Sequence, residues 1–256
     1  MLNTETLFVG RAAIYLQTVG STNAYAKELI AKSKPSSGTV IWAGEQTAGR
    51  GQIGSKWETA PFQNLTASFI LNPNFLNANQ QFALNQAIAL AIRDLLLNIN
   101  LSAERVKIKW PNDIYIDTDK VAGVLIENII EKSNIQHSII GIGLNVNQSE
   151  FAPTLKNPTS LYQKTGKNFE ITQLLSQLCS FIEQRFLQLK AQKKAELKAI
   201  YTQNLFRYQE IANFQITESQ EVIQAQILGI SPAGKLIIQQ ENQLREFGIK
   251  EIQFII

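Results

Sequence analysis

The segment GEQTAGRGQIGSKW, which begins at Gly44, combines residue types that suit anion binding. Its four glycines let a backbone approach a ligand closely. Arg50 stands between two of them, where no neighbouring side chain blocks its forked set of donors. The segment lacks the Gly-Lys-Ser/Thr of a P-loop. Two interpretations therefore stay open, a loop that holds phosphate and a flexible surface loop built from ordinary turn residues.

A second segment, KWPNDIYIDTDKVAGVLIE, predicts charged side chains at the end of a strand. Pro111 supplies no amide and disfavours a helix at the residue before it. Lys109 and Asp113 are therefore expected where a strand ends, and Lys120 follows a hairpin turn. Lysines and a carboxylate so placed suit chemistry on anions.

Glycines in the second segment and in a third, GIGLNVN, predict a slot beside a sheet. Alternation places Gly141 and Gly143 on the same face of a strand, and a strand face without side chains leaves a slot. Gly123 likewise leaves room beside the backbone. Leu125 and Ile142 are candidate walls, although alternation turns Ile142 to the opposite face.

The composition limits the chemistry that these segments can perform. The chain has 256 residues, 45% of them hydrophobic and 18% charged, with a net charge of +3, which indicates a globular protein. It has one histidine, His137, and one cysteine, Cys179, which lies in an apolar helical stripe and is expected in the core. The usual zinc-ligand sets and Ser-His-Asp or Cys-His machinery cannot be assembled from these two residues. Lysine, arginine, carboxylates, amides or backbone must carry the chemistry.

The same features suggest a location and exclude some partners. A lone cysteine fits a reducing compartment, and neither a signal peptide nor a bilayer-spanning run is recognisable. The mild positive charge forms no dominant basic face. We therefore expect a cytoplasmic protein that binds neither nucleic acid nor membrane.

The patterns along the chain predict an α+β fold with a mixed or antiparallel sheet flanked by helices. Helices are expected at 21–33 and 77–100, and a long helical pattern without glycine or proline at 169–204. Strands are expected at 37–46, 63–71, 105–110 and 136–147, with a hairpin at 113–128. Short strands after about Arg207 predict a small SH3-like β-barrel, which divides the chain into domains 1–206 and 207–256.

Several residues near these segments have simpler interpretations. Trp42 and Trp110 occupy strand positions that favour burial in the core. Lys107 is expected to be a solvated strand residue, and Asp117 and Asp119 to be turn residues and not metal ligands.

Together the three segments closely resemble biotin protein ligases. The resemblance rests on Gly-Arg-Gly followed by Trp57, then Lys-Trp-Pro-Asn-Asp with a later Lys-x-Ala-Gly, then Gly-x-Gly-x-Asn, in this order. It implies a class II synthetase-like catalytic domain followed by an SH3-like domain. It also implies that biotin and ATP, with Mg²⁺, form biotinyl-5′-adenylate, which then acylates a lysine of a biotin carboxyl carrier protein. Such ligases occur as monomers and as homodimers.

The resemblance also implies roles for individual residues. The catalytic residues would be Arg50, Lys109 and Lys120. The biotin-binding residues would be Ser21, Thr22, Asn23, Gln46, Arg50, Gly51, Gln52, Lys120, Gly123, Leu125, Gly141 and Gly143. The nucleotide-binding residues would be Gly49, Arg50, Trp57, Lys109, Asn112, Asp113 and Asn145. No dedicated metal-ligand set is implied.

Two departures from the family pattern bear on these roles. Gln52 stands where many members carry a second arginine, which weakens the positive field of the loop. The ligase-like part starts near residue 10, so the helix-turn-helix domain and repressor function of some members are not expected here.

Other interpretations of the same residues stay open. Ser21 and Thr22 suit the cap of a helix as well as a ligand. A lipoate- or octanoate-handling acyltransferase and a non-catalytic biotin-binding module are the alternative functions.

Overall fold

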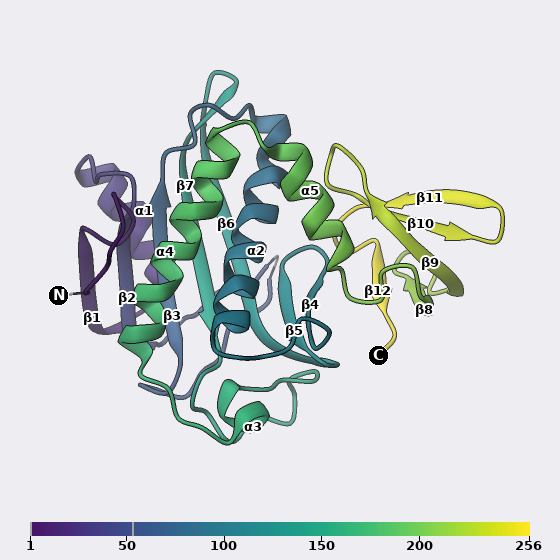
Figure 1. The fold of residues 1–256 in the computed structure, drawn as a ribbon, viewed down its shortest axis with the longest axis horizontal. Helices are drawn as coiled ribbons and strands as arrows, with labels where there is room; N and C mark the ends of the chain where they lie inside the picture. Colours follow the sequence, from purple (N-terminus) through teal and green to yellow (C-terminus); the bar gives the residue numbers. More distant parts are fainter. Residues whose placement is uncertain (1, 53) are drawn as a thin grey trace.

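The main body of the protein is a seven-stranded sheet covered by helices on both faces (Figure 1). The structure is a computed structural model that describes residues 2–52 and 54–256. The strand order is β1-β2-β3-β7-β6-β5-β4, with β1 parallel to β2 and every other pair antiparallel. The strands are β1 (Ala13–Val19), β2 (Thr39–Gln46), β3 (Leu65–Leu71), β4 (Val106–Lys109), β5 (Asp113–Ile116), β6 (Asp119–Glu131) and β7 (Asn134–Leu144).

Alternation along the central strands divides the core between the two faces of this sheet. Val40 belongs to the larger cluster, beneath α2 (Gln81–Asn98) and α4 (Ile171–Lys190). Its neighbour Ile41 belongs to a smaller cluster with Ala26 of α1 (Thr22–Lys32). A short 3₁₀ turn, η1 (Ala78–Gln80), leads into α2, and α5 (Lys194–Gln203) packs against α2. Strand β3 is buried along its whole length, because helices cover both faces of the sheet there, and it is largely apolar as a result.

A second, five-stranded antiparallel sheet follows α5 (Figure 1). Its order is β11-β10-β9-β8-β12. The strands are β8 (Ile211–Ile216), β9 (Val222–Ile230), β10 (Leu236–Gln240), β11 (Gln243–Phe247) and β12 (Ile252–Phe254). The module contacts the larger sheet, since the Trp110 indole donates a hydrogen bond to the Gly234 carbonyl at 3.0 Å. The expected domain boundary near Arg207 lies between α5 and β8, and the division itself stays a prediction.

The α+β class and the mixed sheet are confirmed. The hairpin at 113–128 is β5 and β6, and Asp117 takes a positive φ of 58° in its turn, as a turn residue can. Trp110 and Cys179 are buried as expected, and burial raises the pKa of the Cys179 thiol to about 12. No helix within the described ranges is both long and apolar enough to cross a bilayer.

Some expected elements were wrong or missing. The single helical pattern at 169–204 is two helices, α4 and α5, because the chain turns at Gln192 with a φ of 63°. Strand β1 has a partly exposed, irregular pattern at the sheet edge, which explains why alternation did not reveal it. Helix α3 (Leu161–Thr165) is too short for a periodic signal. Trp42 is only partly buried, since its ring stacks on exposed Tyr15 of the edge strand at 4.3 Å.

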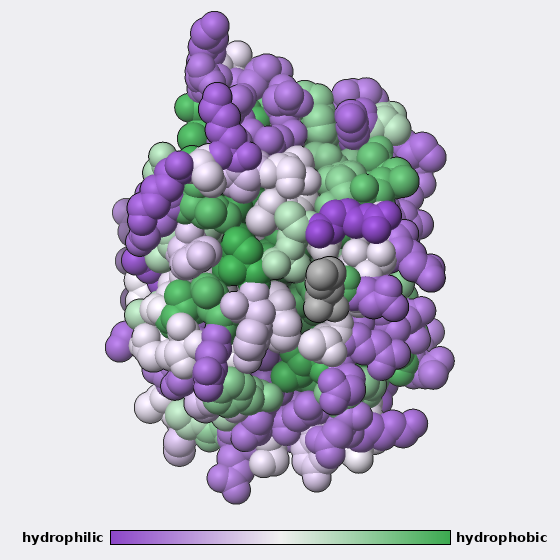
Figure 2. Space-filling model, turned by 90° about the vertical axis from the view of Figure 1, so that its left-hand side faces the viewer, coloured by the Kyte–Doolittle hydropathy of each residue, from purple (hydrophilic) through white to green (hydrophobic). Residues whose placement is uncertain are grey.

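One face of the molecule is shown in Figure 2, turned so that the left-hand side of Figure 1 faces the viewer. Hydrophilic residues predominate at its rim, and hydrophobic residues are scattered among them towards the middle. A scattered pattern of this kind is normal for a protein surface.

Candidate active site

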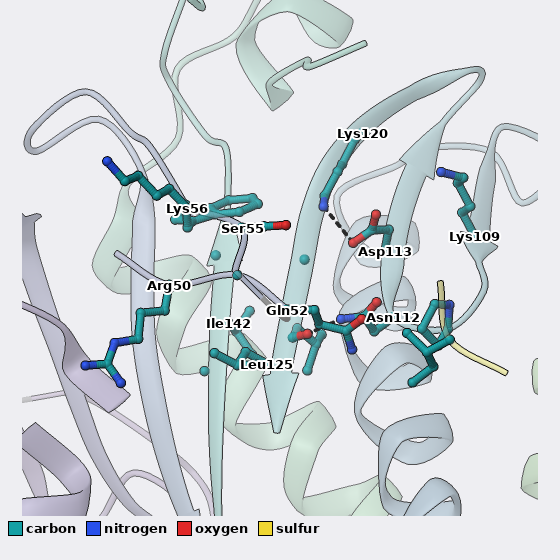
Figure 3. Close-up of a pocket in the computed structure, with 18 of the residues that line it drawn as sticks. Arg50, Gln52, Ser55, Lys56, Lys109, Asn112, Asp113, Lys120, Leu125 and Ile142 are labelled. Atoms are coloured by element: carbon teal, nitrogen blue, oxygen red, sulfur yellow. Dashed lines mark hydrogen bonds and ion pairs between the residues drawn. The ribbon is translucent and has the colours of Figure 1, made fainter. Parts of the chain in front are cut away.

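A cavity of about 520 Å³ opens where the three segments meet (Figure 3). The glycine-rich segment, the β4–β5 and β6 region and strand β7 all contribute to its lining. The start of α1 and the C-terminal module complete it. The sequence-predicted residues in the lining are Ser21, Thr22, Asn23, Gln46, Arg50, Gly51, Gln52, Trp57, Lys109, Asn112, Asp113, Lys120, Gly123, Leu125, Gly141 and Gly143.

The glycines of β7 let other side chains pack against the strand. A Cβ at Gly141 would overlap the Asn23 amide, and a Cβ at Gly143 would overlap the Trp57 indole. The predicted slot is therefore narrowed by these two side chains. Leu125 and Ile142 both lie in the lining (Figure 3).

One end of the cavity is a buried network of amides and hydroxyls. The backbone N–H and the hydroxyl of Thr22 donate to Gln46 Oε1 at 2.8 and 3.1 Å. Asn23 accepts from the Ser68 hydroxyl at 2.6 Å and donates to Glu127 at 2.8 Å. Each amide is thereby held in one orientation.

Three features of this network differ from or add to the sequence analysis. Ser21 occupies the N-cap position of α1, but its side chain makes no capping hydrogen bond. Ser68 and Glu127 were not singled out. Ser68 is fully buried in an otherwise largely apolar strand, and a buried hydroxyl of this kind was the available signal.

Cations lie on opposite sides of the cavity, and the charged ends of Arg50 and Lys56 point away from its middle (Figure 3). Arg50 and Lys56 come from the glycine-rich segment, which forms a small turn closed by a hydrogen bond from Gly51 N–H to the Ser55 carbonyl at 2.8 Å. Lys120 comes from β6. These residues place positive charge on both sides of the cavity.

Lys120 is paired with the one carboxylate among the described lining residues. Its ammonium lies 2.7 Å from Asp113 Oδ1 and 5.6 Å from the centroid of the Trp57 ring. Both side chains of the pair keep some solvent exposure. Asp113 therefore orients Lys120 without removing it from the cavity.

Lys109 is held in an aromatic environment at the end of β4. Its ammonium lies 5.3 Å from the ring centroids of both Tyr115 and Phe254, which are cation–π distances. Burial lowers the pKa of Lys109, and the nearby positive charge of Lys120 contributes, while the Asp113 carboxylate opposes the shift.

The turn between β4 and β5 is fixed from the helical layer. The Pro111 carbonyl accepts hydrogen bonds from the Asn85 amide of α2 at 2.7 Å and the Tyr201 hydroxyl of α5 at 2.8 Å. Asn112 is buried, and its amide donates to the Val124 carbonyl of β6. These contacts set the positions of the flanking residues Lys109 and Asp113.

Two predicted nucleotide-binding residues lie outside the lining. Gly49 lies against Trp57, and its carbonyl accepts a hydrogen bond from the backbone N–H of Trp57 at 3.1 Å. Asn145 is buried, and its amide donates to the Thr159 carbonyl at 2.9 Å. Asn145 Oδ1 and Trp57 Nε1 are buried polar atoms without a hydrogen-bond partner in the described part of the chain. Such atoms are costly unless a ligand pairs with them.

The C-terminal module supplies a wall that sequence reasoning missed. Its lining residues are Thr217, Ile249, Lys250, Ile252, Gln253 and Phe254. Lys156, from the connection between β7 and α3, also lines the cavity. Nothing local in the sequence marks these residues, because only the packing of distant segments brings them to the site.

No cluster of three histidine, cysteine or acidic residues suited to a metal ion occurs in the described ranges. Asp117 and Asp119 are paired with cations instead, Asp117 with Arg105 at 2.8 Å and Asp119 with Lys164 at 2.8 Å.

A cavity beside a mixed sheet, lined by amides, glycines and cations, suits the binding of a small carboxylic acid. Residues 15–145 match the model of the biotin/lipoate A/B protein ligase family. The chain belongs to this family.

Curated relatives and a solved structure agree with that membership. The biotin--[acetyl-CoA-carboxylase] ligase of Paracoccus denitrificans is 31% identical over 229 residues, which cover 87% of this chain and 92% of the relative. The bifunctional ligase/repressor BirA of Bacillus spizizenii is 28% identical, over 97% of this chain and 76% of the relative. A biotin protein ligase from Aquifex aeolicus, solved in complex with biotin and ATP, is 30% identical with a TM-score of 0.77, over 95% of this chain and 98% of that one.

Proposed function

We propose that this protein is a biotin protein ligase, which uses ATP to attach biotin to a lysine of a biotin carboxyl carrier protein. The observation that carries the proposal is one cavity lined by amide and hydroxyl side chains, by the glycines of β6 and β7 and by several cations. A ligand with a neutral polar head, an apolar chain and a terminal carboxylate matches these three kinds of lining. Biotin has this constitution.

The amide end suits the ureido ring of biotin, which both donates and accepts hydrogen bonds. Ser21, Thr22, Asn23 and Gln46 present hydroxyl and amide groups there. Buried partners hold Asn23 and Gln46 in place, so a ligand would meet donors and acceptors that are already oriented. Leu125 and the β7 glycines would flank the apolar part of the ligand.

The cations suit the first chemical step. An oxygen of the biotin carboxylate attacks the α-phosphorus of ATP, the bond to the β-phosphate oxygen breaks, and biotinyl-5′-adenylate and pyrophosphate form. This step brings two anions together, and Arg50, Lys109 and Lys120 would offset their repulsion. Lys120 would bridge the carboxylate and the phosphate, and Lys109 would stabilise charge on the reacting phosphoryl group.

The unpaired buried atoms suit an adenine. Trp57 Nε1 is a donor and Asn145 Oδ1 is an acceptor, and neither has a partner within the described chain. The edge of adenine offers a complementary ring nitrogen and exocyclic amine. We infer that the adenine of the nucleotide forms a hydrogen bond with at least one of these two atoms.

Magnesium would enter with ATP and stay bound mainly by phosphate oxygens and water. The residues fit this mode, because Asp113 is the single carboxylate among the described lining residues and is already paired with Lys120. Mg²⁺ would neutralise phosphate charge during the step.

In the second step, the amine of the carrier lysine attacks the carbonyl carbon of the adenylate. An amide forms, AMP leaves with the former anhydride oxygen, and the amine loses a proton. The glycine-rich segment that carries Arg50 would shield the adenylate from water until the carrier arrives.

The finer assignments around this function are also proposals. They are a cytoplasmic location, a carboxylase carrier as the protein partner, no nucleic acid or membrane partner, and a monomeric or homodimeric state.

A pyrophosphate-release assay with MgATP tests the function. We expect release that depends on biotin, and transfer of biotin to an added carrier domain detected by its mass. Release with lipoate or octanoate but not biotin would support the acyltransferase alternative and overturn the proposal. Biotin binding without pyrophosphate release would indicate a binding module instead.

A further inference from the structure

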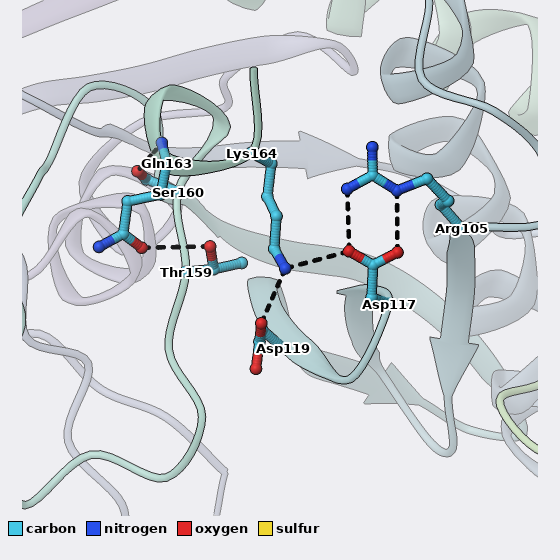
Figure 4. Close-up of polar contacts among 7 residues, drawn as sticks. All are labelled: Arg105, Asp117, Asp119, Thr159, Ser160, Gln163 and Lys164. Atoms are coloured by element: carbon cyan, nitrogen blue, oxygen red, sulfur yellow. Dashed lines mark hydrogen bonds and ion pairs between the residues drawn. The ribbon is translucent and has the colours of Figure 1, made fainter. Parts of the chain in front are cut away.

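A network of two cations and two carboxylates lies at the turn between β5 and β6 (Figure 4). Arg105 binds Asp117 through two parallel hydrogen bonds of 2.8 and 2.9 Å. Lys164 of α3 reaches both Asp117, at 3.1 Å, and Asp119, at 2.8 Å. None of these four residues lines the cavity.

Lys164 is the more enclosed of the two cations. Its side chain is 16% exposed, against 41% for Arg105. Burial alone lowers the pKa of Lys164, but the hydrogen bonds to Asp119 and Asp117 outweigh it and raise the pKa. The ammonium is therefore held charged between two carboxylates that would otherwise repel each other.

The chain that leads into α3, residues 157–160, lies directly against Lys120. The Lys120 N–H donates to the Asn157 carbonyl at 2.7 Å, and the Lys120 carbonyl accepts from the Thr159 N–H at 2.9 Å. Ser160 then caps α3, accepting from the Gln163 N–H at 3.1 Å. The N–H and the carbonyl of Lys120 are thus both held by this segment, which leads into the helix that carries Lys164.

The sheet itself holds Lys120 less firmly on its other side. The pairing of β5 with β6 shifts register between Ile114 and Tyr115, so that Tyr115 pairs with Lys120 but Ile114 pairs with Ala122. An irregularity of this kind interrupts the ladder and re-aims side chains. The direction of Lys120 depends correspondingly more on the segment 157–160.

We propose that Lys164 is a positioning residue for Lys120. Its ammonium closes a loop of contacts, from Asp119 next to Lys120, through α3 and the segment 157–160, back to the Lys120 backbone. This role rests on the proposed function, in which Lys120 bridges the biotin carboxylate and the phosphate. Without the ammonium, two adjacent carboxylates lose a shared partner and the turn moves away from α3.

The experiment compares Lys164→Met with the matched control Arg105→Met in steady-state adenylation, measured by biotin-dependent pyrophosphate release. Each variant removes one cation from Asp117. Of the two cations, only Lys164 also pairs with Asp119 and so connects the hairpin turn to α3. We expect Lys164→Met to lower kcat about tenfold with less than a threefold change in the KM for ATP. The kcat of Arg105→Met should stay within twofold of the wild-type value, and Lys164→Arg should keep most of the wild-type kcat.

Thermal unfolding of the same variants separates positioning from stability. A lower Tm in Lys164→Met with an unchanged kcat, or equal losses of kcat in Lys164→Met and Arg105→Met, would overturn the proposal. If Lys164→Met does not fold, Asp119→Asn removes the same contact from the other side and should give the same loss of kcat. A wild-type kcat in Asp119→Asn would then overturn the proposal. An inactive wild-type protein would contradict the proposed function instead.

Discussion

Lys109 shows how one side chain acquires a special environment from its neighbours. Lys107 stands two residues earlier on the same strand face, but it does not line the cavity. The Lys109 ammonium lies at cation–π distance from two aromatic rings, and burial lowers the pKa of Lys109. A desolvated cation stabilises developing charge more strongly than a solvated one.

Lys109→Met should therefore lower the kcat of adenylation about 100-fold, or about 3 kcal/mol, with a small effect on the KM for biotin. The control Lys107→Met should leave both parameters near the wild-type values. Both constants come from pyrophosphate release at varied biotin. A raised KM with an intact kcat in Lys109→Met would contradict a role for Lys109 in the transition state.

Gln52 is the second residue whose chemistry can be tested directly. It lines the cavity two positions after Arg50. A glutamine can donate a hydrogen bond to phosphate, but charge-assisted bonds are roughly twice as strong. Gln52→Arg should slow the dissociation of biotinyl-adenylate about fivefold, and Arg50→Ala should accelerate it far more. An unchanged dissociation rate in Gln52→Arg would show that this position does not help to close the segment.

The β5–β6 hairpin is the element whose stability depends most visibly on charge. The hydrogen bonds from Arg105, with further help from Lys164, lower the pKa of Asp117 to about 2. An acid whose pKa is lower in the folded state stabilises that state when the pH is above the ordinary pKa of the group, near 3.9. This stabilisation is lost as the pH falls towards the lowered pKa.

Asp117→Asn should consequently make the thermal stability of the protein less dependent on pH at acid pH. The Tm of the wild type should fall more steeply than that of Asp117→Asn between pH 4 and pH 2, and the two proteins should differ most above pH 4. Thermal unfolding across this range is the measurement. Parallel curves would show that the ion pair contributes nothing to the acid response.

At the level of the whole molecule, the two sheets share one site. The Trp110 indole joins them through Gly234, and Phe254 of β12 lies over Lys109 of β4. Phe254 also packs at 6.3 Å from Phe206 and 5.1 Å from Phe214. The C-terminal module therefore contributes directly to the environment of Lys109.

Replacing the aromatic ring tests this connection. Phe254→Leu keeps much of the apolar volume but removes the ring face, and it should lower the kcat of adenylation about fivefold, or about 1 kcal/mol. The control Ile255→Ala changes an exposed neighbour and should leave kcat unchanged. If both variants have the wild-type kcat, the module lines the cavity but its aromatic ring does not affect the reactivity of Lys109.

Much of the fold and part of the site could be predicted from the sequence, because they depend on local patterns. Short runs rich in apolar residues indicate β3, β6 and β7, because this signal depends only on residues close together in the sequence. Gly141 and Gly143 indicate close packing because no other residue type leaves the same space. Lys109, Asp113 and Lys120 could be proposed as a group because a proline and a hairpin turn constrain where they lie.

Tertiary packing decided the remainder, because contacts between distant segments leave no local pattern. The division of α4 from α5 at Gln192 occurs without glycine or proline. Phe254 reaches Lys109 across 145 positions of sequence only because β12 packs beside β4. Lys164 meets Asp119 only because the segment 157–160 lies along β6. The residue types set which charges are available, and their distances and burial, which determine what each charge can do, exist only in the folded chain.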